Sequence, residues 1–118
     1  MSEAGEPGEA LGPGDVVWAQ PEIAVGREQA GRRPALVVAG AGYLGTVDTL
    51  VLVVPITSVD RGWPNHVEVV GAELGQPSWA MSEQIRTISR ERVVGRAGRA
   101  DDPTLAAVRG WLADFLDL

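Results

Sequence analysis

The chain of 118 residues contains no cysteine and no lysine, and it has a single histidine. Without cysteine, disulfides, thiolate chemistry and a cysteine-based zinc site are excluded, and nothing in the sequence indicates an oxidising compartment. A cytoplasmic location is therefore expected. The longest apolar run, Leu50 to Ile56, is far shorter than the ~20 residues that cross a bilayer. The first residues, MSEAGEPGEALGPGD, have the pattern of neither a signal peptide nor an anchor, so no membrane association is expected.

Because His66 is the single imidazole, a two-histidine acid–base pair cannot form within one subunit. In WPNHVEV it precedes a predicted strand, where an ordinary surface or turn histidine is expected. The acidic residues are scattered without metal-ligand spacing, so neither a metal site nor a two-metal nuclease is predicted. The segment GAGYLG, residues 40–45, matches neither a dinucleotide-binding fingerprint nor a P-loop, and we interpret it as a turn. No cofactor is predicted.

The formal net charge of -6 is unusual for a protein that binds nucleic acid, but the charges are unevenly distributed. Residues 1–22 hold five acids and no base, and residues 100–118 hold four acids and one arginine. Residues 23–99 hold nine arginines and seven acids, a net charge of +2 (nine minus seven). The planar arginine fork suits bidentate recognition of phosphate, although an all-arginine inventory equally fits GC-rich coding.

The pattern of turns and apolar runs predicts one domain over residues 14–118, preceded by a flexible tail over residues 1–13. Short β-branched runs separated by turn residues favour a small β-barrel. The predicted strands are Asp15–Gln20, Ala35–Ala39, Thr46–Thr57, His66–Val70, Ser78–Ser82, Gln84–Ser89 and Val93–Ala97.

The last segment has the period of a helix instead. Asp102 is the predicted cap and Pro103 fits the first helical position. One face of this helix is expected to pack against the barrel; it carries Leu105, Val108, Leu112, Phe115 and Leu116.

Three stretches occur in order along the chain: GREQAGRRPALVV (26–38), VVPITS (53–58) and SEQIRTIS (82–89). With GDVVWA (14–19), RGWPNHVEV (61–69) and a final helix ending in FLDL, they resemble the motifs of the MazF/PemK toxin family. The resemblance implies a mainly β fold, an SH3-like small β-barrel with a C-terminal α-helix, assembled as a homodimer. It also implies the toxin of a type II toxin–antitoxin system, bound by a cognate antitoxin. Its activity would be metal-independent, sequence-specific cleavage of single-stranded RNA, whether messenger, ribosomal or transfer RNA, to 2′,3′-cyclic phosphate and 5′-OH ends.

The resemblance also implies which residues act. In the R-P motif, Arg33 takes the place of the catalytic arginine, and in P-I-T-S, Thr57 takes that of its partner threonine. In the PemK-like branch, a loop histidine and an Arg-x-Asp arrangement transfer the protons. Here Arg27 stands at the place of the histidine, and Met81 and Glu83 stand at the places of the arginine and the aspartate. The general base therefore stays unidentified. The residues expected to contact RNA are Arg27, Gln29, Ser58, Glu83, Gln84, Arg86 and Thr87.

Two other functions stay open: a non-catalytic toxin of the same fold that binds a protein target such as gyrase, and an inactive SH3-like interaction module. The gyrase-poisoning relatives lack the R-P and P-I-T-S pair, which favours cleavage. Arginines 90, 92, 96 and 99 alternate with apolar residues, which is typical of one solvated face. Each of the four tryptophans (18, 63, 79 and 111) suits stacking on bases, but such residues more often belong to a core or interface. Trp63 is expected to be the most exposed.

Overall fold

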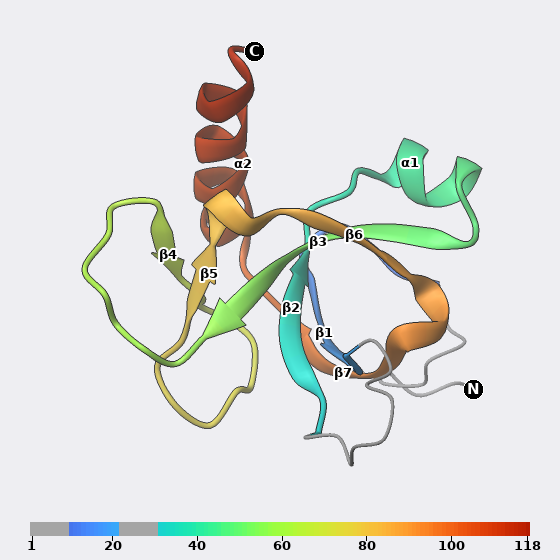
Figure 1. Ribbon diagram of the computed structural model, residues 1–118, viewed down its shortest axis with the longest axis horizontal. Coiled ribbons are helices and arrows are strands. Elements are labelled where there is room, and N and C mark those ends of the chain that lie inside the picture. Colours follow the sequence, from blue (N-terminus) through green and yellow to red (C-terminus); the bar gives the residue numbers. More distant parts are fainter. Residues whose placement is uncertain (1–9, 22–30) are drawn as a thin grey trace.

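The computed structural model describes residues 10–21 and 31–118, which form an antiparallel sheet and two helices (Figure 1). No helix within these ranges is long and apolar enough to span a membrane. The strands are β1 (Asp15–Ala19), β2 (Arg33–Val37), β3 (Leu50–Thr57), β4 (His66–Glu68), β5 (Trp79–Met81), β6 (Arg86–Ser89) and β7 (Val93–Arg99). The helices are α1 (Ala41–Thr46) and α2 (Asp102–Leu116), with 3-10 turns η1 (Ser82–Gln84) and η2 (Arg90–Arg92).

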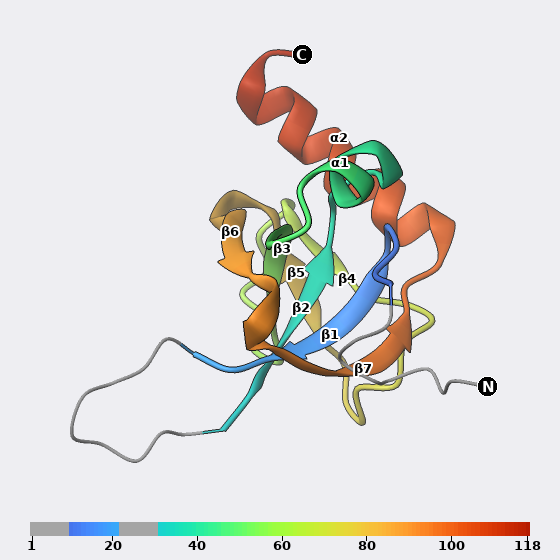
Figure 2. The same ribbon diagram turned by 90° about the vertical axis from the view of Figure 1, so that its right-hand side faces the viewer.

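Strand β3 organises the sheet because it pairs with three other strands. The strand order is β4-β5-β3-β2-β1-β7, and β6 pairs with β3 off this path. The first half of β3 pairs with β6 and its last residues pair with β5, so the sheet curls around β3. Figure 2 shows the other side of the curled sheet, where β1 lies between β2 and β7. This confirms the predicted SH3-like barrel with a C-terminal helix, although no ladder closes the sheet within the described residues.

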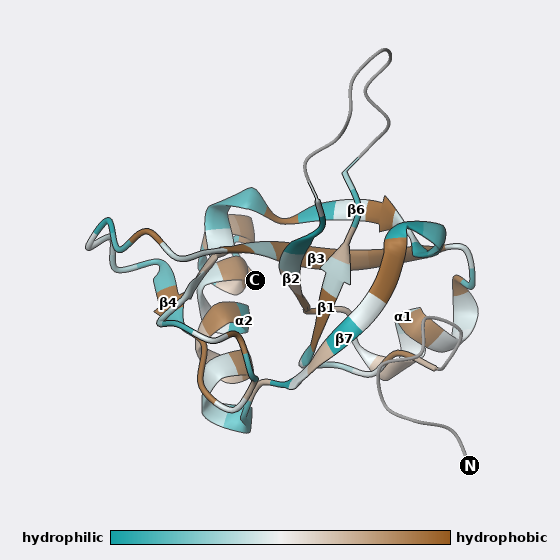
Figure 3. Ribbon diagram, turned by 90° about the horizontal axis from the view of Figure 1, so that it is seen from below, coloured by the Kyte–Doolittle hydropathy of each residue, from teal (hydrophilic) through white to brown (hydrophobic). Residues whose placement is uncertain are grey.

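The core consists of two clusters because successive side chains of a strand point to opposite faces. Val16 and Leu36 face one cluster, which includes Val108 of α2. Their neighbours Val17 and Val37 face the other cluster, inside the curl of the sheet. Figure 3 shows that β3, which contributes to both clusters, is hydrophobic along most of its length. Residues of the first cluster, Ile56 with the packed side chains of Trp18 and Leu74, also reach the candidate site.

Helix α2 begins one residue earlier than predicted. The cap is Asp101, not Asp102, since the Asp101 carboxylate accepts a hydrogen bond from the Thr104 backbone N–H at 2.9 Å. Hydrogen bonds from the Thr104 side chain and backbone hold the pKa of Asp101 below its usual range. The predicted packing face is confirmed at Leu105, Val108 and Leu112 but wrong at its end, because Phe115 and Leu116 are exposed.

The segment between β2 and β3 also differs from the prediction. Residues 40–45 were expected to be a turn and Thr46 to begin a strand, but helix α1 occupies Ala41–Thr46 and β3 begins at Leu50. The guanidinium of Arg90 donates to the carbonyls of Leu44 and Val47, each at 2.7 Å, and of Leu50 at 2.9 Å. Arg90 therefore joins the end of α1 and the loop after it to the start of β3.

The described part of the predicted tail contacts the domain. Leu11 packs against the second core cluster, and the Gly12 N–H donates to the Asp15 carboxylate at 2.8 Å. Arg96 pairs with the same carboxylate at 3.3 Å and donates to the Ala10 carbonyl. Residues 1–9 of the predicted tail lie outside the described residues.

Candidate functional site

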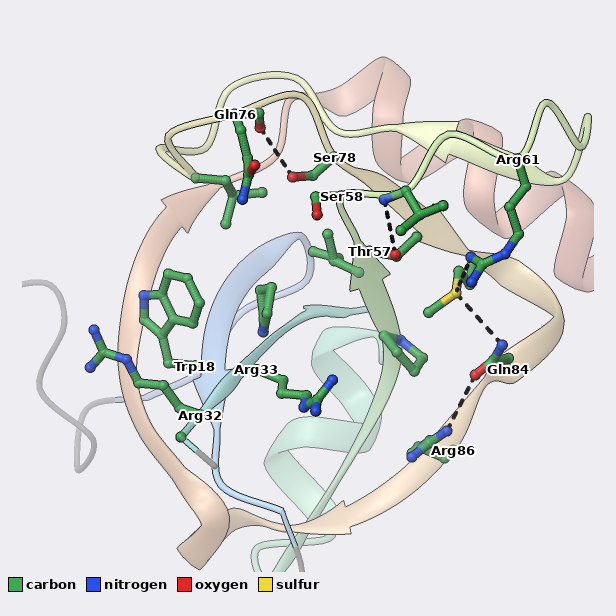
Figure 4. A pocket seen from close by; sticks show the side chains of 17 residues that line it. Trp18, Arg32, Arg33, Thr57, Ser58, Arg61, Gln76, Ser78, Gln84 and Arg86 are labelled. Atoms are coloured by element: carbon green, nitrogen blue, oxygen red, sulfur yellow. Dashed lines mark hydrogen bonds between the residues drawn. The ribbon is translucent and has the colours of Figure 1, made fainter. Parts of the chain in front are cut away.

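A cavity of about 760 Å³, called the central groove below, opens where β2 begins and β3 ends (Figure 4). Its walls carry four arginines and, among the described residues, no aspartate or glutamate. A second cavity of about 300 Å³ shares Arg33, Pro34, Pro55 and Arg86 with the groove. This distribution places positive charge on the groove of a chain whose formal net charge is -6. Its charge is suited to a polyanion.

The register between β2 and β3 brings Arg33 and Thr57 together. Ala35 and Pro55 are the last pair of this antiparallel ladder, so Arg33 and Thr57 each lie two residues beyond it, at adjoining ends of their strands. Both side chains belong to the face that carries Val37 and Val53 deeper in the curl, and both line the central groove. Figure 4 shows Arg33 in the middle of the groove, below Thr57 and Ser58. Two strands of one ladder thus present a cation and a hydroxyl to the same space.

The hydroxyl of Thr57 has a fixed environment. Its oxygen accepts a hydrogen bond from the Val59 backbone N–H at 3.1 Å, in the turn that follows β3. A hydroxyl has one donor and two acceptor lone pairs, and no other described residue bonds it, so within the described part of the chain its hydrogen and one lone pair are available for a ligand. The half-buried Thr57 side chain can therefore donate to a phosphate oxygen or accept from a sugar hydroxyl.

Polar side chains from two segments form one end of the groove. Arg86 donates to the Gln84 side-chain oxygen at 3.5 Å, and the Gln84 amide approaches the Met81 sulfur at 3.6 Å. Arg61, from the loop after β3, approaches the same sulfur at 3.9 Å. Ser58 also lines the groove. Five of the predicted site residues (Arg33, Thr57, Ser58, Gln84 and Arg86) thus share one cavity.

Glu83 lies beside this cavity and does not line it. Its carboxylate accepts from the Asn65 amide at 2.6 Å and contacts Nε2 of His66 at 3.1 Å. The prediction of a surface or turn histidine is wrong, since His66 is 7% exposed and Nδ1 is buried without a partner among the described residues. Burial raises the pKa of Glu83, but the hydrogen bonds from His66, the backbone and Gln84 outweigh it and hold that pKa below its ordinary value.

Of the remaining predicted contacts, one is described by the structure and does not lie in the groove. Thr87 pairs with Leu52 of β3 and does not line either cavity. Arg27 and Gln29 lie outside the described residues.

The prediction of a solvated arginine face near β7 is wrong for three of its four members. Arg90 binds three carbonyls, Arg96 pairs with Asp15, and Arg92 donates to the Gln20 carbonyl at 2.7 Å while lining the second cavity. Arg99 is exposed, as predicted. The prediction that Trp63 is the most exposed tryptophan is confirmed, since 49% of it is exposed.

Some groove residues were missed from the sequence. Arg32 and Arg61 stand within the motifs GRRP and RGWP, so their places next to Arg33 and in the basic turn were available signals. Gln76 lies in a loop between β4 and β5 without any motif, and only the fold brings it to the groove.

Comparison with known proteins identifies this arrangement. Residues 12–116 match the model of the PemK-like, MazF-like toxins of type II toxin–antitoxin systems. The chain belongs to this family. It is 32% identical over 98 residues to the endoribonuclease EndoA of Bacillus subtilis, which covers 80% of this chain and 84% of that protein. It is 33% identical over 76 residues to the endoribonuclease toxin MazF of Escherichia coli K12, which covers 64% of this chain and 66% of MazF.

Solved structures of MazF proteins share the fold of this MazF-like chain. MazF of Deinococcus radiodurans, in a crystal structure of MazE–MazF, superposes with a TM-score of 0.79 at 34% identity, covering 93% of this chain and 98% of that one. A crystal structure of MazF from the same organism gives a TM-score of 0.74 at 34% identity, covering 93% and 99%. The family resemblance inferred from three motifs is thereby confirmed over nearly the whole domain.

Proposed function

We propose that this MazF-like endoribonuclease toxin cuts single-stranded RNA at specific sequences without a metal ion, and that Arg33 and Thr57 carry the reaction. The observation that supports this most directly is the position of the two side chains, which line the same groove at adjoining ends of β2 and β3 together with three further arginines. RNA supplies its own nucleophile, the 2′-OH, so a site that aligns the phosphate and stabilises its charge is sufficient for a large acceleration.

In the proposed reaction the ribose 2′-oxygen attacks the adjacent phosphorus and the bond from phosphorus to the 5′-oxygen breaks. The 2′-OH proton leaves, the departing 5′-oxygen gains a proton, and the products are a 2′,3′-cyclic phosphate and a 5′-OH. The guanidinium of Arg33 binds the non-bridging oxygens and stabilises the charge that develops on them. Thr57 positions the 2′-OH or a phosphate oxygen through the hydrogen and lone pair that Val59 leaves available.

The surroundings of Glu83 bear on proton transfer. Its carboxylate binds Asn65 and His66 and lies outside the groove wall, so this carboxylate is a poor candidate for the general base. We therefore assign Glu83 to holding the Gln84–Arg86 segment beside the groove. Ser58, Gln84 and Arg86 contact the RNA around the cut.

We further propose that the chain acts as a homodimer and is inhibited by a cognate antitoxin. The MazF of Deinococcus radiodurans crystallised with MazE is the precedent among relatives at 34% identity. An acidic segment of the antitoxin is complementary to the four arginines of the groove, so inhibition and RNA binding compete for the same surface.

The test is cleavage of a long single-stranded RNA in excess EDTA by wild type, Arg33→Ala and Thr57→Ala, with the exposed Arg99→Ala as a matched charge-loss control. Discrete cuts with 5′-OH ends are expected from wild type and Arg99→Ala. Arg33→Ala should cut at least ~10²-fold more slowly, and Thr57→Ala should be weakened. Equal cutting by folded Arg33→Ala, or cuts that require a divalent metal, would refute the proposed reaction. No cutting by wild type on several RNAs would favour a toxin that binds a protein target.

A further inference from the structure

The end of the central groove opposite Arg61 and Arg86 has a different chemistry. Trp18 of β1 and Arg32, directly before β2, form this end together with Gln76 from the loop after β4 (Figure 4). The guanidinium carbon of Arg32 lies 4.9 Å from the centre of the Trp18 ring, within the range of a cation–π contact. The groove therefore has an aromatic end and a cationic end, with Arg33 and Thr57 between them.

The strand register fixes this end relative to the proposed cleavage site. Trp18 pairs with Pro34 and Ala19 pairs with Arg33 in the β1–β2 ladder. The half-buried indole packs against the first core cluster, so its position is determined by the fold. Arg32 is exposed, and Arg33 follows it in the chain. A base that meets the Trp18–Arg32 pair belongs to a nucleotide near the phosphate bound by Arg33.

The chemistry of the wall matches a nucleobase. Single-stranded RNA is read by stacking of unpaired bases on aromatic rings or arginine planes and by hydrogen bonds to base edges. Trp18 and Arg32 provide such planes. The Gln76 side-chain amide provides two donors and an acceptor, and it has no hydrogen-bond partner among the described residues. The nearby Ser78 hydroxyl donates to the Gln76 backbone carbonyl at 3.1 Å, which anchors the loop and leaves the amide available.

We propose that Trp18, Arg32 and Gln76 form a nucleobase subsite, in which one unpaired base near the scissile phosphate stacks on Trp18 and Arg32 and Gln76 hydrogen-bonds its edge. This rests on the proposed function, since the bound base belongs to the RNA that is cut. The subsite separates binding of a base from binding of the phosphate at Arg33. It also assigns a distinct function to one of the four tryptophans, because Trp63 does not line the groove and instead contacts the His66 ring at 4.7 Å between centroids.

The first test measures binding without cleavage. Random-sequence, single-stranded 2′-fluoro RNA lacks the nucleophilic hydroxyl, and its affinity is measured by fluorescence anisotropy. Trp18→Leu should bind about tenfold more weakly than wild type, because stacking is worth ~1–3 kcal/mol per base. Trp18→Phe keeps a stacking ring and should stay within about threefold of wild type. Trp63→Leu, the matched control outside the groove, should bind like wild type.

Because Trp18 packs against the core, thermal unfolding must show that each variant is folded at the assay temperature. Arg32→Lys provides an independent variant that keeps the charge and loses the planar group. It touches no core cluster, and a roughly threefold weaker affinity is expected from the lost stacking alone. Equal affinity of wild type, Trp18→Leu and Arg32→Lys would overturn the subsite.

The second test locates the base. After the cut site is mapped, an abasic spacer replaces each nucleotide in turn in a 2′-fluoro RNA carrying that site. At one position near the cut, the spacer should weaken the affinity of wild type about tenfold and leave the affinity of Trp18→Leu unchanged. The reason is that the missing base and the missing ring remove the same contact. Additive losses at every position would overturn the subsite even if wild type cuts RNA. Conversely, RNA that binds through Trp18 and is never cut would refute the proposed function alone.

Discussion

Nε2 of His66 contacts both carboxylate oxygens of Glu83, each at 3.1 Å. A carboxylate only accepts hydrogen bonds, so Nε2 carries the hydrogen in this contact. The pair joins the start of β4 to the turn η1, directly before the groove residues Gln84 and Arg86. The contact favours the ionised carboxylate and lowers the pKa of Glu83, which makes it sensitive to pH.

Glu83→Gln is expected to remove a pH-dependent part of the stability. The hydrogen bonds hold the folded-state pKa of Glu83 below its ordinary value of 4.5, so the ionised carboxylate stabilises the fold above that pH. This contribution is lost as the pH falls through the lower folded-state pKa. Denaturant unfolding near pH 7 should show the variant about 1 kcal/mol less stable, with the difference shrinking below pH 4.5. A difference that stays constant through the acid range would contradict this account.

Substitutions of Thr57 distinguish its hydroxyl from its shape. Thr57→Val keeps the branched side chain and loses the hydroxyl that Val59 orients, and the rate of cutting should fall about 10²-fold. Thr57→Ser keeps the hydroxyl and should retain activity within roughly one order of magnitude of wild type. Single-turnover cleavage of one mapped RNA gives both rates. If valine and serine variants cut equally fast, the hydroxyl has no part in the reaction.

Arg86→Gln is expected to weaken RNA binding in a salt-dependent manner. Arg86 lines both cavities and is exposed, so its charge is available to a phosphate. For single strands, each neutralised phosphate contributes about 0.7 to the slope of log affinity against log salt. The slope for 2′-fluoro RNA should therefore fall by about 0.7 in this variant. Arg99 lines neither cavity, so Arg99→Gln should leave the slope unchanged.

Arg90→Met is expected to affect stability and not chemistry. The substitution leaves the carbonyls of Leu44, Val47 and Leu50 without their charged donor, and a loss of about 2 kcal/mol in the free energy of unfolding is expected. Arg99→Met is the matched exposed control. Cleavage below the melting temperature should match wild type, because Arg90 lines neither cavity. Loss of cutting by a folded Arg90→Met would show that α1 communicates with the site.

Gly71→Ala is expected to be among the most damaging small substitutions. Gly71 has φ of +106°, and an added Cβ would lie 3.0 Å from both the Arg99 carbonyl oxygen and the Asp101 nitrogen. Backbone strain and the close contacts together should lower the free energy of unfolding by more than about 2 kcal/mol. Gly75 also has a positive φ, of +83°, but open space around its Cβ, so Gly75→Ala should cost only about 1 kcal/mol. Equal thermal stability of the two variants would contradict the proposed clash.

Much of the strand pattern followed from the sequence, because short β-branched runs alternate with turn residues. The existence of all seven strands and α2 was predicted, and their ends were displaced by a few residues. The errors have physical reasons. Residues 41–46 contain two glycines and lack a helical pattern, and the short helix they form is held by Arg90, which is distant in the chain. His66 was misplaced because its partner Glu83 is brought to it by the pairing of β4 with β5.

The candidate site could be predicted where its residues stand in motifs. Arg33 and Thr57 were placed by the R-P and P-I-T-S motifs, and the β2–β3 register explains why these motifs meet. Gln76 could not be found in this way, since no motif surrounds it and its position depends on the path of a loop. Glu83 and Thr87 stand in the third motif, yet strand alternation and the contact with His66 direct them away from the groove.

The ladder between β2 and β3 also has an evolutionary consequence. Arg33 and Thr57 occupy strand ends whose separation is fixed by backbone pairing, whereas Arg61 and Gln76 stand on loops of the same groove. Loops tolerate substitution and changes of length far better than paired strands. Under the proposed function, changes in these loops alter which RNA sequences are selected while the geometry of cleavage stays constant.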